Sequence, residues 1–275
     1  MGMIGRDIMD RMAELKSAGE PFALATVVRT VSVTAAKAGA KAVIRADGSI
    51  SDGWIGGGCA RGAVLKAARE ALADGQPRLV SVSPEDVLNE RGVAAGETKD
   101  GVKFACNMCP SQGTMDIFVE PILPQPALTV CGTSPVALAL LDIAPRFGFA
   151  VTGCSPVAEH VAYPADLRRI EGYDLPKITA DSHYVVVATQ GKGDEAVLRG
   201  VLASDAGFAA FVGSRRKMAS LRTALQSSAS QDRLDAIQAP AGLDLGAITP
   251  DEIALSILAA MIRHRRLGQR TTGGM

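Results

Sequence analysis

The sequence predicts an α/β protein with a mixed-sheet N-terminal domain and a Rossmann-like C-terminal domain built on a parallel sheet. The first of three observations is the length of 275 residues, more than the roughly 100–200 that one domain usually holds. Three prolines within residues 121–126 form a stiff extended segment, where we place the domain boundary. Beyond it, strand and helix patterns alternate, which calls for a parallel sheet with right-handed crossovers. We therefore expect one domain over residues 1–122 and the other over residues 127–275.

In the N-terminal domain, apolar residues spaced by three or four predict an amphipathic helix over residues 4–18. Strand patterns occupy residues 22–33, 41–45, 49–55 and 113–120. The third of these strands runs into three glycines, after which residues 60–73 are helix formers. Residues 84–103 are polar and show no clear period, so the sequence assigns no element to them.

In the C-terminal domain, apolar strands are predicted over residues 127–130, 149–154, 184–189 and 208–212. Helices between them are predicted over residues 134–147, 194–202 and 214–225. Thr249 and Glu252 form a capping-box pattern with Pro250 at the first helical position, which predicts a last helix. The tail over residues 270–275 is expected to be disordered.

Composition and charge exclude several classes of protein. Lys and Arg total 29 and Asp and Glu total 29, so there is no net positive charge to hold a nucleic-acid backbone. The longest apolar stretches fall short of the roughly 20 residues that cross a bilayer, and the charged N-terminus lacks the apolar core of a signal peptide. We therefore expect a cytoplasmic protein that has no transmembrane segment and binds no nucleic acid. In such a protein the five cysteines are expected to be thiols.

Three successive glycines, Gly56, Gly57 and Gly58, precede Cys59 at a strand-to-helix turn. Glycine favours neither strand nor helix, so this run indicates that a ligand or another segment approaches the backbone closely. Cys59 lies at the start of the following helix, where the dipole favours a thiolate that can act as a nucleophile, sulfur carrier or metal ligand. A buried small apolar side chain is the alternative role for this cysteine.

A second turn, made of Gly132, Thr133, Ser134 and Pro135, follows a strand and opens a helix. N–H groups at a helix start attract phosphate, which predicts a dinucleotide site. Ser134 stands where the glycine fingerprint has its second glycine, so an ordinary turn with Ser134 as N-cap is the alternative. The next strand ends at Ser155 without the acid that usually holds the ribose of NAD, and Ser155 itself is a candidate nucleotide contact, with a plain strand end as the alternative. Either the nucleotide is not NAD, or another group replaces that contact.

A third set, Gly213, Ser214, Arg215 and Arg216, follows a later strand. Ser214 is a candidate N-cap, and the two arginines and Lys217 oppose the helix dipole unless an anion lies near. We therefore expect a phosphate neighbour. Solvated cations spread around the helix are the alternative.

Cys106 and Cys109 form a C-x-x-C pair in a loop before a strand, a spacing that suits one soft metal ion or a reversible disulfide. One pair is only half of a tetrahedral zinc site, and no second pair follows at a suitable spacing. The functional expectation is Cu(I) binding or redox chemistry, and an inert surface pair is the alternative.

Several segments together resemble the XdhC/CoxI family of maturation factors for molybdenum hydroxylases. In the first half the resemblance rests on residues 47–50 (DGSI), 56–59 (GGGC) and 62–64 (GAV). In the second half it rests on residues 212–217 (VGSRRK), 239–247 (APAGLDLGA) and 249–257 (TPDEIALSI). The turn at residues 132–135 departs from the family's common Gly-x-Gly start and looks more like the carbon monoxide dehydrogenase accessory branch. Cys106 and Cys109 replace a Cys-Gly-Gly arrangement familiar in that loop.

The resemblance implies a carrier or assembly factor more than a catalyst. Such a protein holds a molybdenum pterin cofactor, assists its sulfuration or metal loading, and delivers it to an apo-enzyme such as xanthine or carbon monoxide dehydrogenase. In the carbon monoxide dehydrogenase branch the cofactor is a molybdenum pterin cytosine dinucleotide, and copper is a further metal. The implied partners are the large subunit of the apo molybdenum hydroxylase, a cysteine desulfurase and a second copy of the chain.

Two other functions stay open. A βαβ domain with a phosphate loop also supports an NAD(P)-dependent oxidoreductase, although no His or Tyr proton donor stands beside the loops in the sequence. The cysteine pair alternatively indicates a copper-handling or thiol-handling protein.

Overall fold

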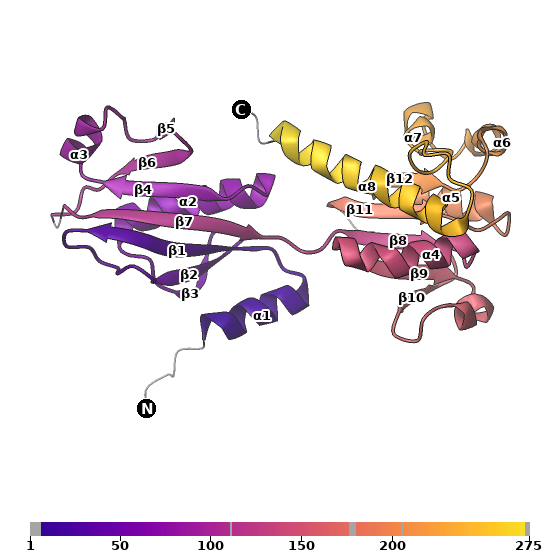
Figure 1. Cartoon of the computed structure of the whole chain (residues 1–275), viewed down its shortest axis with the longest axis horizontal. Coiled ribbons are helices and arrows are strands. Elements are labelled where there is room, and N and C mark those ends of the chain that lie inside the picture. The colour runs from indigo at the N-terminus through magenta and orange to yellow at the C-terminus, as the bar shows by residue number, and fades with distance from the viewer. Residues whose placement is uncertain (1–6, 111, 176–179, 205, 273–275) are drawn as a thin grey trace. The chain divides into compact units, whose positions relative to one another are not determined.

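The computed structural model describes residues 7–110, 112–175, 180–204 and 206–272 (Figure 1). The chain divides into two compact units, with the break between Pro124 and Gln125. The N-terminal unit contains a mixed sheet of seven strands, and the C-terminal unit contains an all-parallel sheet of five strands. The predicted fold class is therefore confirmed for both parts of the chain.

The N-terminal sheet has the strand order β3-β2-β1-β7-β4-β6-β5. Its strands are β1 (Phe22–Val31), β2 (Lys41–Arg45), β3 (Ile50–Gly53), β4 (Arg78–Ser83), β5 (Thr98–Lys99), β6 (Val102–Cys106) and β7 (Thr114–Ile122). Neighbouring strands are antiparallel except β4 and β6. A parallel pair needs a crossover connection, and the segment that contains the short helix α3 (Glu85–Glu90) provides it.

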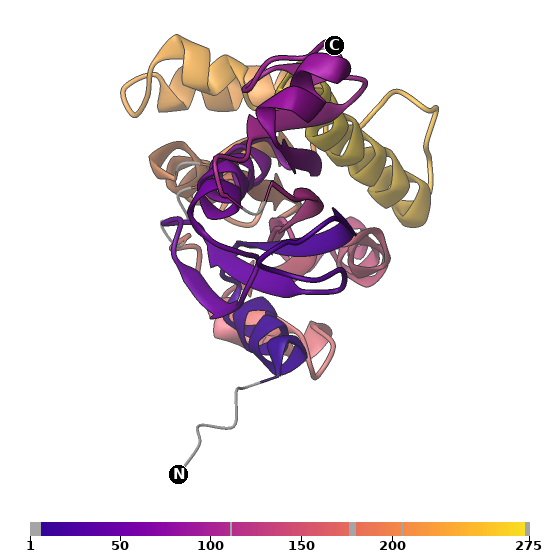
Figure 2. The same ribbon diagram turned by 90° about the vertical axis from the view of Figure 1, so that its left-hand side faces the viewer.

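Helices α1 (Ile8–Ala18) and α2 (Gly58–Asp74) lie on opposite sides of this sheet (Figure 2). Successive side chains of a strand point to opposite faces, and β1 follows this rule. Ala23 and Ala25 share a core with α2, whereas Phe22 shares a core with Leu15 of α1. The face of α2 that packs on the sheet consists largely of small side chains, the buried residues Ala60, Val64, Ala67, Ala68 and Ala71.

The C-terminal sheet has the strand order β10-β9-β8-β11-β12. Its strands are β8 (Ala127–Cys131), β9 (Ala150–Ser155), β10 (Arg168–Glu171), β11 (Ala180–Val187) and β12 (Ala206–Phe211). Counted along the chain, this is the 3-2-1-4-5 order of a Rossmann sheet. The order reverses between β8 and β11, and open α/β sheets bind their ligands at such a point.

Two helical layers enclose the C-terminal sheet. Helices α4 (Pro135–Ile143) and α8 (Pro250–Thr272) share one core with it, around Tyr184 and Val186 of β11. Helices α5 (Asp194–Ala203), α6 (Arg215–Leu225) and α7 (Gln231–Asp235) contribute to the other core, around Val185 and Val187. The alternation along β11 therefore separates the two layers. Two 3₁₀ turns, η1 (Ala144–Phe147) and η2 (Val157–Ala162), precede and follow β9.

The structure corrects three sequence predictions. Residues 84–103 contain α3, β5 and the start of β6, elements too short for a periodic pattern to reveal. Pro121 and Ile122 belong to β7, where Pro121 pairs with Ala23, although the sequence predicts a connector there. Helix α8 continues to Thr272, so residues 270–272 of the predicted disordered tail are helical, because extending an existing helix adds one hydrogen bond for each residue fixed. Residues 273–275 of that prediction lie outside the described residues.

The predicted capping box at the start of α8 is confirmed. Thr249 Oγ1 accepts from the N–H of Glu252 at 3.3 Å, and Glu252 Oε2 accepts from the N–H of Thr249 at 2.9 Å. The box satisfies two N–H groups that the helix leaves without an internal partner.

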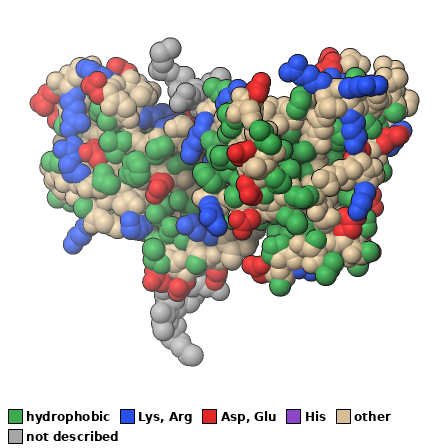
Figure 3. Space-filling view, turned by 45° about the vertical axis from the view of Figure 1, so that its right-hand side comes forward, with side chains coloured by type: hydrophobic (Ala, Val, Ile, Leu, Met, Phe, Trp, Pro, Cys, Tyr) green, Lys and Arg blue, Asp and Glu red, His purple; other side chains and the backbone are tan. Residues whose placement is uncertain are grey.

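Within the described residues, no helix is both long enough and apolar enough to span a membrane. Basic and acidic side chains are interspersed over the face shown in Figure 3, which carries no broad region of one sign.

Candidate functional site

Most of the predicted binding residues lie at one edge of the C-terminal sheet. Because its strands are parallel, their carboxyl ends meet at the same edge. Residues 132–135 follow β8, Ser155 ends β9, and residues 213–216 follow β12. The fold thus brings together three sets of residues that the sequence analysis treats separately.

The turn after β8 needs glycine at its first position. Gly132 has φ +106°, and a Cβ there would lie 2.7 Å from the carbonyl oxygen of Ala188. Its N–H donates to the carbonyl of Cys154 at 2.8 Å, and its carbonyl accepts from the hydroxyl of Tyr163 at 3.0 Å. Burial raises the pKa of Tyr163 to about 12, so this hydroxyl stays protonated and can donate. The backbone of the turn is therefore held by the neighbouring strands and loops.

Ser134 caps α4, as the alternative interpretation expects. Its Oγ accepts from the N–H of Ala137 at 3.1 Å, and Pro135 occupies the first helical position. The first N–H groups of a helix have no intrahelical partner, and proline has no N–H at all. Since the cap uses Ala137, the N–H of Val136 is the remaining helical donor at this end. The cap therefore leaves fewer N–H donors for a phosphate, but the N–H of Val136 remains.

A carboxylate lies beside this turn, although the sequence has no acid at the end of β9. Glu159 Oε2, in η2, accepts from the hydroxyl of Thr133 at 2.7 Å, and Lys192 Nζ lies 3.9 Å from Glu159 Oε1. The η2 turn after Pro156 brings the acid back to the loop, a return that strand patterns do not predict. Ser155 is fully buried, and its hydroxyl donates to the carbonyl of Pro156.

An ion pair between the buried Asp194 and the partly exposed Lys217, which no sequence pattern predicts, joins the segments after β11 and β12. Asp194 of α5 is 5% exposed, pairs with Lys217 of α6, and accepts from the Thr189 hydroxyl and from the N–H of Gly191. Burial alone would raise the pKa of Asp194, but the hydrogen bonds, led by that from Lys217, outweigh it and hold the pKa below its ordinary value. The network fixes the loop that packs against Gly132.

The cations at the start of α6 divide into two kinds. Lys217 is occupied by Asp194. Arg215 and Arg216 are exposed, and neither has a carboxylate partner among the residues that the structure describes. Ser214 caps α6, since its Oγ accepts from the N–H of Lys217 at 3.2 Å. Both arginines are therefore available to an anion.

A cavity of about 440 Å³ opens beside Arg215. It is lined by Val212, Gly213 and Arg215 after β12, by residues 240–247, and by Ile253 and Ser256 of α8. These residues come from the three segments of the second half on which the family resemblance rests. The fold gathers all three segments around one cavity.

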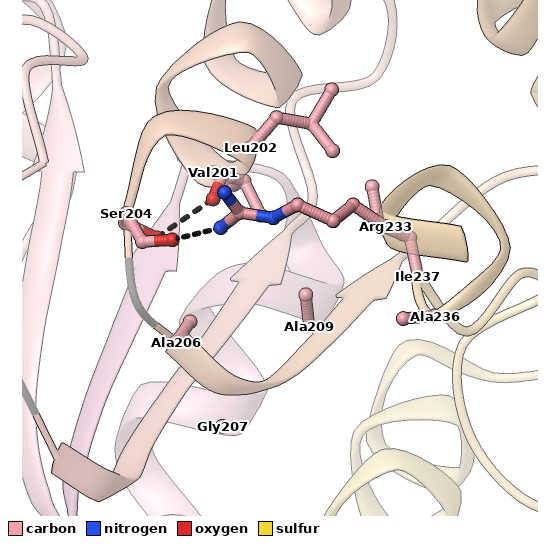
Figure 4. Close-up of a pocket in the computed structure, with 9 residues that line it drawn as sticks. All are labelled: Val201, Leu202, Ser204, Ala206, Gly207, Ala209, Arg233, Ala236 and Ile237. Carbon is pink, nitrogen blue, oxygen red and sulfur yellow. Dashed lines mark hydrogen bonds between the residues drawn. The ribbon is translucent and has the colours of Figure 1, made fainter. Parts of the chain in front are cut away.

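A smaller cavity of about 100 Å³ lies between α5, β12 and α7 (Figure 4). The guanidinium of Arg233 crosses it and donates to the carbonyl of Ser204 at 2.6 Å, while the Ser204 hydroxyl donates to the carbonyl of Val201. Ligand pockets usually measure about 300–1,000 Å³, so we assign no ligand to this cavity.

In the N-terminal unit, the three glycines before α2 differ from one another. Gly56 has φ +111°, and a Cβ there would lie 3.2 Å from Met115 Cε, so the fold itself favours glycine. At Gly57 and Gly58 no atom lies within 4 Å of the Cβ position. Gly57 is the N-cap of α2 and provides no side-chain hydrogen bond. Packing does not require the second and third glycines, although the N-cap position of Gly57 favours glycine. The open space at both positions fits the predicted approach of a ligand.

Cys59, Cys106 and Cys109 are half-buried free thiols of the same unit. Cys106 pairs with Ser83 at the end of β6 and β4. Met115 of β7 pairs with Val82 near the same end of the sheet, and Gly56, in the turn before α2, lies beside Met115. Asn107 shapes the loop, since its Oδ1 accepts from the N–H of Cys109 at 3.1 Å. Among the described residues, no three His, Cys, Asp or Glu side chains are grouped to hold a metal ion. A metal bound by Cys106 and Cys109 would have two protein thiolates.

Cys131 and Cys154 are free thiols of another kind. They pair across β8 and β9 and are fully buried. Hydrogen bonding with Cys154 and burial raise the pKa of Cys131 well above its ordinary value. The Cys131 side chain therefore packs in the core beneath the turn at residues 132–135.

Comparison with known proteins gives matches in both units. Residues 128–261 match the XdhC Rossmann domain family, and residues 15–83 match the XdhC and CoxI family. The chain is 27% identical over 266 residues to the uncharacterized protein YqeB of Escherichia coli K12, an alignment that covers 94% of this chain and 46% of YqeB. The chain thus spans about half the length of that relative. A crystal structure of a xanthine dehydrogenase from Bacillus halodurans superimposes with a TM-score of 0.46 and 18% identity, covering 94% of this chain and 96% of that one.

Proposed function

Because the chain belongs to the XdhC and CoxI family, we propose that it is a maturation factor that binds the molybdenum pterin cofactor and delivers it to a molybdenum hydroxylase. Family membership supports a general role in the maturation of these enzymes. The binding step is our inference from the C-terminal unit. There, residues 132–135 hold the pyrophosphate of the cofactor's dinucleotide, and Arg215 and Arg216 add positive charge.

One observation supports this site above the others: the turn at residues 132–135 lies where the strand order of the parallel sheet reverses. The positive end of the α4 dipole and the N–H of Val136 face that point, a combination that attracts phosphate. Gly132 packs closely on Ala188, so the loops after β8 and β11 lie against each other and form one surface. A ligand at the reversal point would contact both loops.

The groups around this turn favour a carrier over a catalyst. Glu159 accepts from Thr133, Tyr163 donates to Gly132, and Asp194 is paired with Lys217. General acids and bases need a titratable group directed at the substrate. In the described part of this edge, these groups instead hold one another and the backbone. The arrangement suits a fixed binding surface.

The finer features of the proposal concern cargo and partners. The cargo is a molybdenum pterin cytosine dinucleotide, and the recipient is the large subunit of an apo hydroxylase of the carbon monoxide dehydrogenase type. Cys59, Cys106 and Cys109 are the candidates for handling sulfur or Cu(I), because accessible thiolates serve both. A cysteine desulfurase and a second copy of the chain are the further candidate partners.

Titration calorimetry with CDP and NAD tests the nucleotide site. Glu159 provides a carboxylate of the kind that holds the ribose in NAD sites, so NAD is the competitor that matters. We expect the full chain to bind CDP more tightly than NAD. Tight binding of NAD without binding of CDP would favour the oxidoreductase alternative.

Two variants of Ser134 locate the binding. Asp and Asn both cap a helix as well as Ser, so Ser134→Asp and Ser134→Asn each preserve α4. Only the aspartate places a negative charge beside the phosphate, and we expect it to weaken CDP binding at least tenfold relative to the asparagine variant. Equal affinities in the two variants would show that CDP binds elsewhere.

A further inference from the structure

We propose that the cavity formed by residues 240–247 and α8 binds the pterin ring of the cofactor, with the Asp244 carboxylate accepting from its aminopyrimidine edge. The inference rests on the proposed function, because it assigns the second half of the same ligand. The cavity measures about 440 Å³, within the usual range of about 300–1,000 Å³ for sites of small molecules.

The loop that forms the cavity is tied to its surroundings on both sides. The N–H of Ala241 donates to the carbonyl of Phe211 at 3.0 Å, and the N–H of Leu243 donates to the carbonyl of Ser256 at 3.1 Å. A Cβ at Gly242 would collide with Ser256 Oγ, so only glycine lets the loop pack this closely on α8. The walls are therefore formed before a ligand arrives.

The position of the cavity fits the second half of a dinucleotide. It opens at the carboxyl end of β12, and β11 separates β12 from β8. Adjacent strands lie about 4.8 Å apart, so the ends of β8 and β12 are roughly 10 Å apart. In a Rossmann sheet the first βαβ unit takes one nucleotide, here β8, α4 and β9. A ligand with its pyrophosphate at residues 132–135 and its nucleoside toward β9 directs its other end toward this cavity.

The chemistry of the lining fits a flat heterocycle with polar edges. Apolar contacts come from Val212, Leu243, Leu245 and Ile253. Of the residues that line the cavity, Asp244 is the one carboxylate and Arg215 the one cation. A pterin carries an amino group and a ring N–H side by side, and a carboxylate can accept from both.

The test uses 2-amino-4-oxopteridine, whose own fluorescence reports binding to the full chain. We expect saturable binding that Asp244→Asn weakens at least tenfold, the loss of a hydrogen bond to a charged group. Asp142→Asn is the matched control, because Asp142 is exposed on α4, outside the cavity. Ala247→Phe places a ring inside the cavity and should abolish binding, while circular dichroism verifies that both variants fold.

Unaltered pterin affinity in both Asp244→Asn and Ala247→Phe would overturn the assignment, and so would displacement of the pterin by cytidine, which would put the nucleoside in the cavity. CDP titration of the same variants separates the two proposals. CDP binding without pterin binding contradicts the pterin site alone. Failure of both ligands to bind contradicts the proposed function as well.

Discussion

The turn before α2 and the turn before α4 both lead from a strand into a helix, but the fold supports them differently. The turn before α4 is enclosed: Gly132 packs on Ala188, Tyr163 holds its carbonyl, and Ser134 caps the helix. The turn before α2 has a glycine N-cap with no side-chain hydrogen bond, and open space surrounds the Cβ positions of Gly57 and Gly58. Glycine is therefore present in the two turns for different reasons.

A glycine before a helix indicates a ligand site only where the fold itself does not require glycine. Gly132 is required by the fold, whether or not a ligand binds, so its presence alone is weak evidence for a nucleotide site. Gly57 and Gly58 have no such requirement. Open space at these two glycines leaves room for something outside the chain, such as the predicted ligand. The better evidence for the C-terminal site is its location at the strand reversal.

Gly132→Ala gives the largest expected effect. The new methyl group would meet the backbone of Ala188 at a residue with φ +106°, and strain of this kind together with the clash should cost about 3 kcal/mol of unfolding free energy. Urea unfolding of the full chain measures it. Gly58→Ala is the matched control, because alanine favours the helix and its methyl group meets no atom; stability should stay equal or rise by about 0.5 kcal/mol. Similar losses of stability in the two variants would contradict the claim that the fold requires glycine at residue 132 but not at residue 58.

Lys217→Met gives the next largest effect, because it removes the partner of the buried Asp194 and loosens the loop behind Gly132. Lys217 is partly exposed, so we expect a loss of about 2 kcal/mol at pH 7, less than for a fully buried pair.

The loss should depend on pH in a defined direction. The pKa of Asp194 is below its ordinary value in the folded protein, so its stabilising contribution is full above the ordinary pKa and is lost as pH falls through the folded one. The difference between wild type and Lys217→Met should therefore shrink below about pH 4. Unfolding curves between pH 7 and pH 3 test this, and a difference that stays constant would exclude the ion pair as its cause.

Much of the fold could be predicted because its strands and helices follow apolar runs, periodic patterns or cap signals in the sequence. The strand at β8, the helix after it, and the capping box of Thr249 and Glu252 all follow from local patterns. The segments around α3 and β5 could not be predicted from periodicity, because these elements are too short to establish a period. β5 pairs with β6 in a hairpin whose two turn residues, Asp100 and Gly101, both have positive φ; Asp-Gly is a local signal for such a turn, so this part of the segment was open to prediction.

The sequence predicts the segments that form the candidate site, but not the side-chain contacts between those segments. The places of residues 132–135 and 213–216 between strands and helices predict them as parts of the site. Glu159 and the pair of Asp194 with Lys217 were missed because each reaches the edge from a separate segment. The cavity lined by residues 240–247 needed the folded loop, although its sequence already stood out as part of the resemblance.

The most direct test of the central claim is to release any ligand that copurifies with the full chain by acid and to identify it by mass. The claim is that the C-terminal unit holds a pterin dinucleotide at the strand reversal. We expect a pterin together with CMP or CDP from the wild type, and loss of both from Ser134→Asp but not from Ser134→Asn. Release of NAD or NADP from the wild type, with no pterin, would contradict the claim.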